Sequence, residues 1–239
     1  MKKKVISVAL AMAIAVPFAG NALAAGPFND IGRSAAQSQI EALQSQGIVQ
    51  GVEDGQFRPT ESLTAAQGVA LIVRSMQLSL AAIDFNTAPT AEGYFEHVSN
   101  SAWYADDLVI AKANGLDIPA DLDPKQPLKR EQFVHWLVQG LEKTGQYPLI
   151  KMYIPIADEA DLATEYQGTV QRALLYKLTA LDAEGNFKPQ TVVTREEAAV
   201  MVYNAVKFVE THQDPVTEGD QPAADDDQPV TDGGAEAAK

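Results

Sequence analysis

The clearest pattern in the chain is an apolar stripe with helical spacing that occurs three times. Its positions are i, i+3, i+4 and i+7, which share one face of an α-helix. The three sets are Val69, Ile72, Val73 and Met76; Val134, Leu137, Val138 and Leu141; and Ala199, Val202, Tyr203 and Val206. Each set follows the previous one at an offset of 65 residues. A constant offset indicates that one helical unit is used three times.

A shorter helical pattern and a turn precede each stripe. The apolar pairs of these shorter helices are Ile40 and Leu43, Leu108 and Ala111, and Val170 and Ala173. Gly47 and Gly115 follow the first two pairs and suit a left-handed helix end. The turns contain Pro59, Pro124 and Pro189. Since one helix pair cannot cover its own stripe, we expect an all-α fold. Three helix-loop-helix repeats would pack in it as a pseudo-threefold helical bundle.

Both ends of the chain differ from this repeat. Residues 1–25 contain three lysines, an uncharged apolar run and the small residues of Ala22-Leu23-Ala24, a layout typical of a secretory signal peptide, with an uncleaved anchor as the alternative. Residues 211–239 lack aromatic residues, Ile, Leu and Met, and carry eight of the 32 acidic residues. We expect a disordered acidic Pro-containing tail there, acting as a solubilising segment or as a spacer or docking tail. The three repeats then occupy residues 26–80, 93–145 and 153–210.

Charge and residue usage exclude several classes of function. The net charge is −14, and loss of Lys2, Lys3 and Lys4 with the leader lowers it to −17, which argues against nucleic acid as a partner. The chain has no cysteine, so packing alone must hold an exported form together. No second segment is typical of a membrane span. His97, His135 and His212 have no metal-ligand spacing, and no catalytic motif is present. We therefore expect no enzyme, no catalytic residues, no cofactor and no metal.

The start of the long helix in each unit carries the candidate chemistry. Thr64 with Gln67, and Thr194 with Glu197, fit a capping box, whereas Lys129 replaces the threonine in the second unit. Arg130 and Arg195 follow at the first helical position, where the helix dipole mildly opposes a cation. An arginine beside free N–H groups would form an anion site, and an ordinary solvated or ion-paired arginine is the alternative. The first unit has Ala65 at this position, so Arg58 or Arg74 would have to substitute.

Four motifs in combination resemble the S-layer homology family. They are Phe28-Asn29-Asp30-Ile31, Gly47-Ile48-Val49-Gln50-Gly51, Asp54-Gly55-Gln56-Phe57-Arg58-Pro59 and Thr194-Arg195-Glu196-Glu197. The resemblance covers almost all of residues 26–210 as three tandem repeats. It is imperfect, because His97 replaces the Asp of the opening motif and the third unit lacks the Gly-Ile turn.

The resemblance implies non-covalent attachment to the cell envelope of a secreted protein at the cell wall or S-layer surface. Members bind secondary cell-wall polysaccharides, often pyruvylated, in grooves between repeats, with the motif arginine on the anionic sugar. The implied glycan-binding residues here are Arg130, Arg195, Asp30, Asp158, Trp103, Arg58 and Gly51. Trp103 could pack in the core, which we favour, or form a groove wall. We expect unequal sites, with Arg195 as the first candidate. The alternative function is a structural envelope or S-layer component that contacts other proteins or peptidoglycan.

Overall fold

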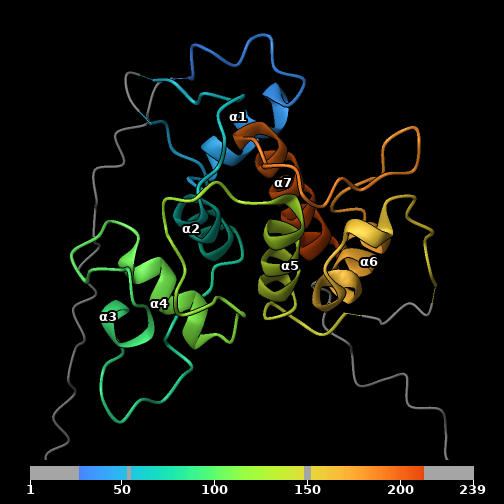
Figure 1. The fold of residues 1–239 in the computed structure, drawn as a ribbon. Helices are drawn as coiled ribbons and strands as arrows, with labels where there is room; N and C mark the ends of the chain where they lie inside the picture. The colour runs from blue at the N-terminus through green and yellow to red at the C-terminus, as the bar shows by residue number, and fades with distance from the viewer. Residues whose placement is uncertain (1–26, 53–54, 148–151, 213–239) are drawn as a thin grey trace, which may run out of the picture.

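The structure, a computed structural model, describes residues 27–52, 55–147 and 152–212 (Figure 1). The elements that build the fold in these residues are helices joined by turns and loops. Its α-helices are α1 (Gln37–Ser45), α2 (Ala65–Ser75), α3 (Ala91–Tyr94), α4 (Ala105–Ala113), α5 (Arg130–Leu141), α6 (Gln167–Leu175) and α7 (Arg195–His212). Two short 3-10 helices, η1 (Glu159–Asp161) and η2 (Thr164–Tyr166), precede α6. The all-α prediction is confirmed. The predicted signal peptide and all but the first two residues of the predicted tail lie outside the described residues.

The helices form a closed arrangement in which each unit completes its neighbour. The second helices of the three units, α2, α5 and α7, contact one another at the centre. Around them, α4 packs on α2, α6 packs on α5, and α1 packs on α7. Figure 1 shows α1 and α7 side by side, although they come from opposite ends of the described chain. Each first helix is therefore covered by the second helix of another unit.

A ring of three backbone hydrogen bonds marks the threefold relation at the centre. The N–H of Leu63 donates to the carbonyl of Val193 at 2.8 Å, and the N–H of Val193 donates to the carbonyl of Leu128 at 2.9 Å. The N–H of Leu128 closes the ring by donating to the carbonyl of Leu63 at 2.9 Å. These three residues precede the three long helices by the same number of positions, so the predicted pseudo-threefold bundle is confirmed.

The predicted stripes form the core with one exception. Eleven of the twelve stripe residues are buried, and Tyr203 is half-buried. Trp136 lies in the same core and is 1% exposed. Two glycines let the central helices approach closely: a Cβ on Gly68 would lie 2.5 Å from Leu128 Cδ2, and one on Gly140 would lie 2.7 Å from Ile72 Cγ2. Apolar burial of this kind is the main stabilising term of the fold.

Some local structure differs from what the sequence predicts. The segment between the first two units contains a short helix that was not predicted from the sequence, α3, whose first turn is capped by the Thr90 hydroxyl accepting from Gly93 N at 3.2 Å. In the third unit Lys177 takes φ +58° at the position where Gly47 and Gly115 end the equivalent helices with φ +71° and +82°.

Within the described ranges, none of the helices combines the length and the apolar character that crossing a membrane requires.

Candidate functional site

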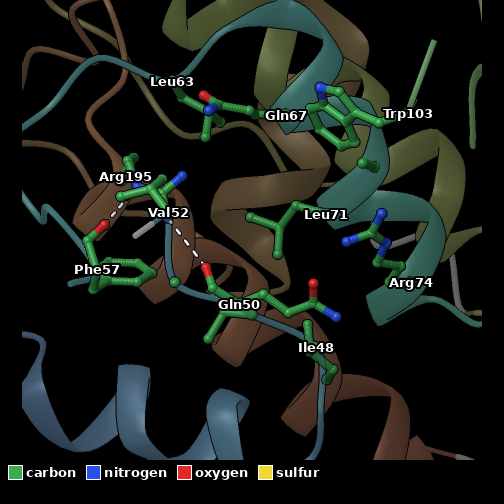
Figure 2. Close-up of a pocket in the computed structure, with 13 residues that line it drawn as sticks. Ile48, Gln50, Val52, Phe57, Leu63, Gln67, Leu71, Arg74, Trp103 and Arg195 are labelled. Carbon is green, nitrogen blue, oxygen red and sulfur yellow. Dashed lines mark hydrogen bonds between the residues drawn. The ribbon is translucent and has the colours of Figure 1, made fainter. Parts of the chain in front are cut away.

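Arg195 lies at the first position of α7 and reaches across to the first unit. Its Nε donates to the carbonyl of Phe57 at 2.7 Å, and its Nη2 donates to the carbonyl of Gln50 at 3.5 Å (Figure 2). The guanidinium also stacks over the Phe57 ring, with Cζ 4.7 Å from the centroid. A planar cation held between carbonyls and an aromatic face has a fixed orientation.

The backbone N–H groups at the long-helix starts are not free. The N–H groups of Arg195 and Glu196 donate to the carbonyls of Glu61 and Pro59, each at 2.9 Å. Arg130 N and Glu131 N donate in the same way to Thr191 O at 2.8 Å and Pro189 O at 3.1 Å. The expectation of an anion site built on free helix N–H groups is therefore wrong. Any anion at these positions must be bound by side chains.

These bonds also show which unit each arginine contacts. The first residue of each long helix donates its backbone N–H to the turn of the next unit, and where this residue is arginine its side chain also lies over that turn. Arg195 of the third unit accordingly covers the first unit, and Arg130 of the second unit covers the third. Ala65 N bonds Gln126 O, at 2.9 Å, in the second unit. The missing arginine thus affects the turn of the second unit, whereas sequence reasoning assigned the loss to the first.

A pocket of about 270 Å³ surrounds Arg195, and we call it the Arg195 groove. Its walls come from all three units. They are Ile48, Val49, Gln50, Gly51, Val52, Phe57, Leu63, Gln67, Ala70, Leu71, Arg74, Trp103 and Arg195 (Figure 2). Trp103 is 62% exposed and lies edge-on to Tyr104 with ring centroids 5.2 Å apart. The preference for core packing of Trp103 was wrong, and the groove-wall alternative is correct.

The charge of Arg195 is only partly balanced by the described residues around it. Within the described residues Arg195 forms no ion pair, and burial lowers the pKa of its guanidinium although the charges of Glu61 and Asp30 oppose the change. Arg74 is different, because its Nη2 lies 2.8 Å from Asp107 Oδ2. Burial raises the pKa of Asp107 despite this pairing, and its side chain is 13% exposed. Arginine keeps its charge at physiological pH, so Arg195 is the available cation.

A second, more apolar groove of about 840 Å³ surrounds Arg130, and we call it the Arg130 groove. Arg130 Cζ lies 5.5 Å from the Phe187 ring centroid, and its Nη2 donates to Thr179 Oγ1 at 3.0 Å. Unlike Arg195, Arg130 is paired with a carboxylate: its Nη1 lies 3.4 Å from Glu197 Oε1. Its Nε is buried without a hydrogen-bond partner in the described structure. Burial lowers the pKa of Arg130, and Glu197 opposes this.

The third equivalent position is a polar pocket between α5 and α6, of about 370 Å³. No arginine enters it from a long-helix start, because Ala65 occupies that position. Glu165, two residues before α6, stands where Trp103 precedes α4 and Ala35 precedes α1. Inside the pocket Arg172 is paired with Glu142, and the buried His135 contacts Thr169 Oγ1 through Nδ1 at 3.0 Å. The three positions therefore differ in charge and in wall chemistry.

Asp30 and Asp158 hold the turns that support the grooves. The two carboxylate oxygens of Asp30 accept from the backbone N–H groups of Phe57 and Arg58 at 2.8 and 2.6 Å. Asp158 accepts in the same way from Phe187 at 2.8 Å and Lys188 at 2.7 Å. Burial opposes ionisation of Asp30, but these backbone bonds hold its pKa below the ordinary value. Both side chains position the loops on which Phe57 and Phe187 lie.

Of the two remaining candidates from the sequence, Gly51 lies in the Arg195 groove and Arg58 lies outside it. Gly51 lines the Arg195 groove, and a Cβ there would lie 2.9 Å from Gln56 O, so the close chain approach requires glycine. Arg58 is outside the lining of this groove; its φ is +57°, and its Nη1 lies 3.3 Å from Glu61 Oε1. The His97 replacement leaves the second unit without the carboxylate clamp, although Glu96 N still bonds Ala120 O at 2.8 Å.

The long-helix starts have the predicted caps. Thr64 Oγ1 accepts from Gln67 N at 3.3 Å, while Gln67 Oε1 accepts from Thr64 N at 3.0 Å. Thr194 and Glu197 form the equivalent pair of bonds, at 3.3 and 2.9 Å. Lys129 has no acceptor in its side chain, so only the bond from Lys129 N to Gln132 Oε1 remains, at 3.4 Å. Sequence reasoning identified these caps but missed that Gln67 and Glu197 also line grooves.

The fold and the grooves define an all-α repeat protein with ligand-sized hollows between its repeats. Two segments, residues 27–67 and 160–199, match the family profile of the S-layer homology domain. Within the described chain these segments include Asp30, Gly51, Thr64 and Gln67 in the first unit, and Arg195 and Glu197 in the third. The match therefore covers most of the residues that build the Arg195 groove.

Longer curated proteins contain segments similar to this chain. Exoglucanase XynX of Acetivibrio thermocellus is 26% identical over 184 residues, which are 75% of this chain and 16% of that protein. Amylopullulanase of Thermoanaerobacterium thermosulfurigenes is 28% identical over 186 residues, 75% of this chain and 9% of that protein. The surface-layer 125 kDa protein of Lysinibacillus sphaericus is 24% identical over 210 residues, 84% of this chain and 16% of that protein. The chain thus spans less than a fifth of each of these relatives.

Proposed function

We propose that this protein is a non-catalytic cell-envelope anchor that binds an anionic cell-wall glycan in the Arg195 groove. The observation that carries the proposal is the partly buried guanidinium of Arg195, which forms no ion pair within the described residues, in a groove walled by the exposed Trp103. The chain would act as a secreted protein at the cell wall or S-layer surface, with three S-layer homology repeats. Its partner would be a secondary cell-wall polysaccharide or peptidoglycan, and other envelope or S-layer proteins are further candidates.

The chemistry of the groove suits a carboxylated sugar. Arg195 uses Nε and Nη2 for carbonyls, so Nη1 is left for a ligand among the bonds of the described residues. A pyruvyl ketal places a carboxylate on a sugar ring, and such a group accepts a charge-assisted hydrogen bond from a guanidinium. The indole of Trp103 offers an apolar face to the ring. Because the chain is strongly acidic overall, affinity for an anionic polymer must arise from local contacts of this kind.

The similar proteins support attachment rather than catalysis. Two of them are named as polysaccharide-degrading enzymes and one as a surface-layer protein, yet each shares with this chain a segment of comparable length. A segment common to proteins with such different names fits an accessory role. In the described residues no group of three or more potential metal-ligating side chains comes together.

Sedimentation of the purified protein with cell walls tests the proposal. Walls are used intact or after acid extraction of the secondary polysaccharide, and binding is measured over a range of salt concentrations. We expect binding to intact walls, loss of binding to extracted walls, and weakening as ionic strength rises. Arg195→Ala should reduce binding more than Arg130→Ala. Equal binding to extracted walls would instead favour peptidoglycan or a protein partner, and full binding by the Arg130→Ala, Arg195→Ala double variant would contradict the anion site.

A further inference from the structure

The third residue of the long helix that lines the groove is different in the Arg195 groove and in the Arg130 groove. In the Arg195 groove this residue is Gln67 of α2, and in the Arg130 groove it is Glu197 of α7. The two positions are equivalent, because both side chains complete the capping box of their own helix. They are separated by twice the repeat offset of 65 residues.

In Gln67 and in Glu197 the capping bond involves one of the two terminal side-chain atoms, and the second terminal atom takes no part in it. Gln67 Oε1 accepts from Thr64 N at 3.0 Å, which leaves an amide nitrogen as the second terminal atom. Glu197 Oε2 accepts from Thr194 N at 2.9 Å, which leaves Oε1, and this oxygen lies 3.4 Å from Arg130 Nη1. The same geometry therefore presents an amide donor to one groove and a carboxylate acceptor to the other.

We infer that this position determines whether each groove accepts an anion. In the Arg130 groove the carboxylate of Glu197 already occupies the guanidinium, so an incoming carboxylate must displace it and meets a like charge. In the Arg195 groove the neutral amide of Gln67 cannot pair ionically with Arg195, and it adds a donor of its own. Gln67 and Glu197 are thus selectivity determinants, the first permitting and the second opposing an anionic ligand. The inference rests on the proposed glycan-anchoring function, and it names what selects the ligand at that site.

Neighbouring residues reinforce the difference. The Arg195 groove has Arg74 in its wall, and the equivalent position of the Arg130 groove is Asn204. Trp103 is replaced by Ala35, and Glu196 adds a second carboxylate to the Arg130 groove, where Ser34 Oγ donates to its Oε2 at 2.6 Å. The Arg130 groove is also the more apolar of the two, with Leu174, Leu178 and Met201 in its lining. Arg130 is thus paired within its own groove, whereas Arg195 forms no ion pair among the described residues.

Two reciprocal substitutions test the inference without removing a cap, because Gln and Glu both serve at this capping position. The probe is a methyl glycoside that carries a pyruvyl ketal, titrated calorimetrically into the purified protein, with acetate as a carboxylate lacking the sugar. We expect Gln67→Glu to lower affinity for the ketal about tenfold, because a bond between Arg195 and the new carboxylate must first be broken. Glu197→Gln should add a second binding event. Gln132→Glu introduces the same charge where Ala65 leaves no arginine, and it should bind like the wild type.

The outcomes separate the inference from the function on which it rests. Wild-type binding that Gln67→Glu leaves unchanged, with unaltered unfolding of the variant, overturns the inference and leaves the anchoring proposal in place. A loss as large in Gln132→Glu as in Gln67→Glu also overturns it, since net charge alone would then explain the effect. A wild-type protein that binds neither the ketal nor intact walls overturns both.

Discussion

The Nε atom of Arg195 donates a hydrogen bond of 2.7 Å to the carbonyl oxygen of Phe57, 138 residues earlier in the chain. One side chain thereby joins the third unit to the first and supplies the cation of the Arg195 groove. Lysine keeps the charge but cannot reproduce the Nε bond together with the planar stack on Phe57. For Arg195→Lys we expect weaker binding to cell walls and a free energy of unfolding lower by about 1 kcal/mol.

Urea unfolding of Arg195→Lys and Arg130→Lys, measured side by side, checks this expectation. Arg130 is the matched control, because its Nε has no partner in the described structure and so loses no bond at that atom. A smaller loss of stability is expected for Arg130→Lys. Equal unfolding midpoints for Arg195→Lys and the wild type would show that the link to Phe57 contributes nothing.

Trp103 and Trp136 provide a contrast between groove wall and core. Trp103 is 62% exposed, and Trp136 is 1% exposed. We expect Trp103→Ala to change the free energy of unfolding by less than about 0.5 kcal/mol, as surface substitutions usually do, while reducing wall binding. Trp136→Ala should cost about 3–5 kcal/mol, as is typical of large-to-small changes in a core. Denaturation and sedimentation of both variants give the result; a strongly destabilised Trp103→Ala would mean that the indole packs in the core.

The carboxylate of Asp30 clamps the turn that carries Phe57. Asp30→Asn keeps one acceptor and replaces the other by an amide nitrogen, which leaves a backbone N–H without its partner. We expect a loss of about 1–3 kcal/mol in the free energy of unfolding. Asp158→Asn makes the same change in the third unit and should behave similarly. Hydrogen exchange of the Phe57 and Phe187 amides measures each clamp separately, and unchanged exchange rates would argue against it.

His135 is expected to make stability fall on acidification. Burial lowers its pKa from the ordinary 6.5, although Asp117, 3.7 Å away, opposes the change. A depressed histidine pKa means that the unfolded chain binds a proton more readily than the folded one. Above about pH 6.5, where His135 is neutral in both states, it does not reduce the free energy of unfolding. The free energy of unfolding then decreases as the pH falls from there towards the pKa of His135 in the folded state. Arg172 and Glu165 also act on the ring, the first lowering and the second raising its pKa.

His135→Gln removes the titration and isolates this effect. The free energy of unfolding of the wild type and the variant is compared between pH 7 and pH 5. The wild type should show the steeper decline, because the variant lacks the group that takes up the proton. Parallel curves would assign the acid sensitivity to other groups.

Lys177 ends α6 in a left-handed conformation that favours glycine. Its φ is +58°, whereas Gly47 and Gly115 occupy the equivalent positions of α1 and α4. A side chain in this region costs roughly 1–2 kcal/mol, so we expect Lys177→Gly to raise the free energy of unfolding by about 1 kcal/mol. Lys177→Ala keeps the Cβ and should give no such gain. Thermal unfolding distinguishes the two variants, and identical melting temperatures would mean that the conformation carries no cost here.

The features that were predicted correctly from the sequence, the apolar stripes and the helix caps, depend on residues close together in the chain. The stripes of Val69, Ile72 and Val73 and their repeats were recognisable because burial on one helix face follows a period of 3.6 residues. The caps of Thr64 and Thr194 were recognisable because a capping box spans four residues. Tyr203 is the exception in its stripe, and its half-burial depends on the neighbours that the bundle gives it.

What the sequence did not reveal depends on partners far along the chain. Whether another segment covers Trp103 depends on residues far along the chain. Its exposure could therefore not be deduced from the neighbouring sequence. The direction in which Arg195 reaches also depends on the order of units around the threefold axis, which a linear repeat leaves open. The free N–H groups expected at the helix starts were occupied for the same reason, since their acceptors, such as Glu61 O, belong to another unit.

The pairing of α1 with α7 affects the order in which the protein can form. During synthesis α1 emerges first, but the helix on which it packs begins at Arg195 and emerges last among the described helices. The ring through Leu63, Leu128 and Val193 likewise cannot close before the third of these residues is available. Contacts so distant in sequence are slow to form because a long loop must first be closed. A partly synthesised chain therefore has no complete core, and folding must follow translation of nearly the whole repeat region.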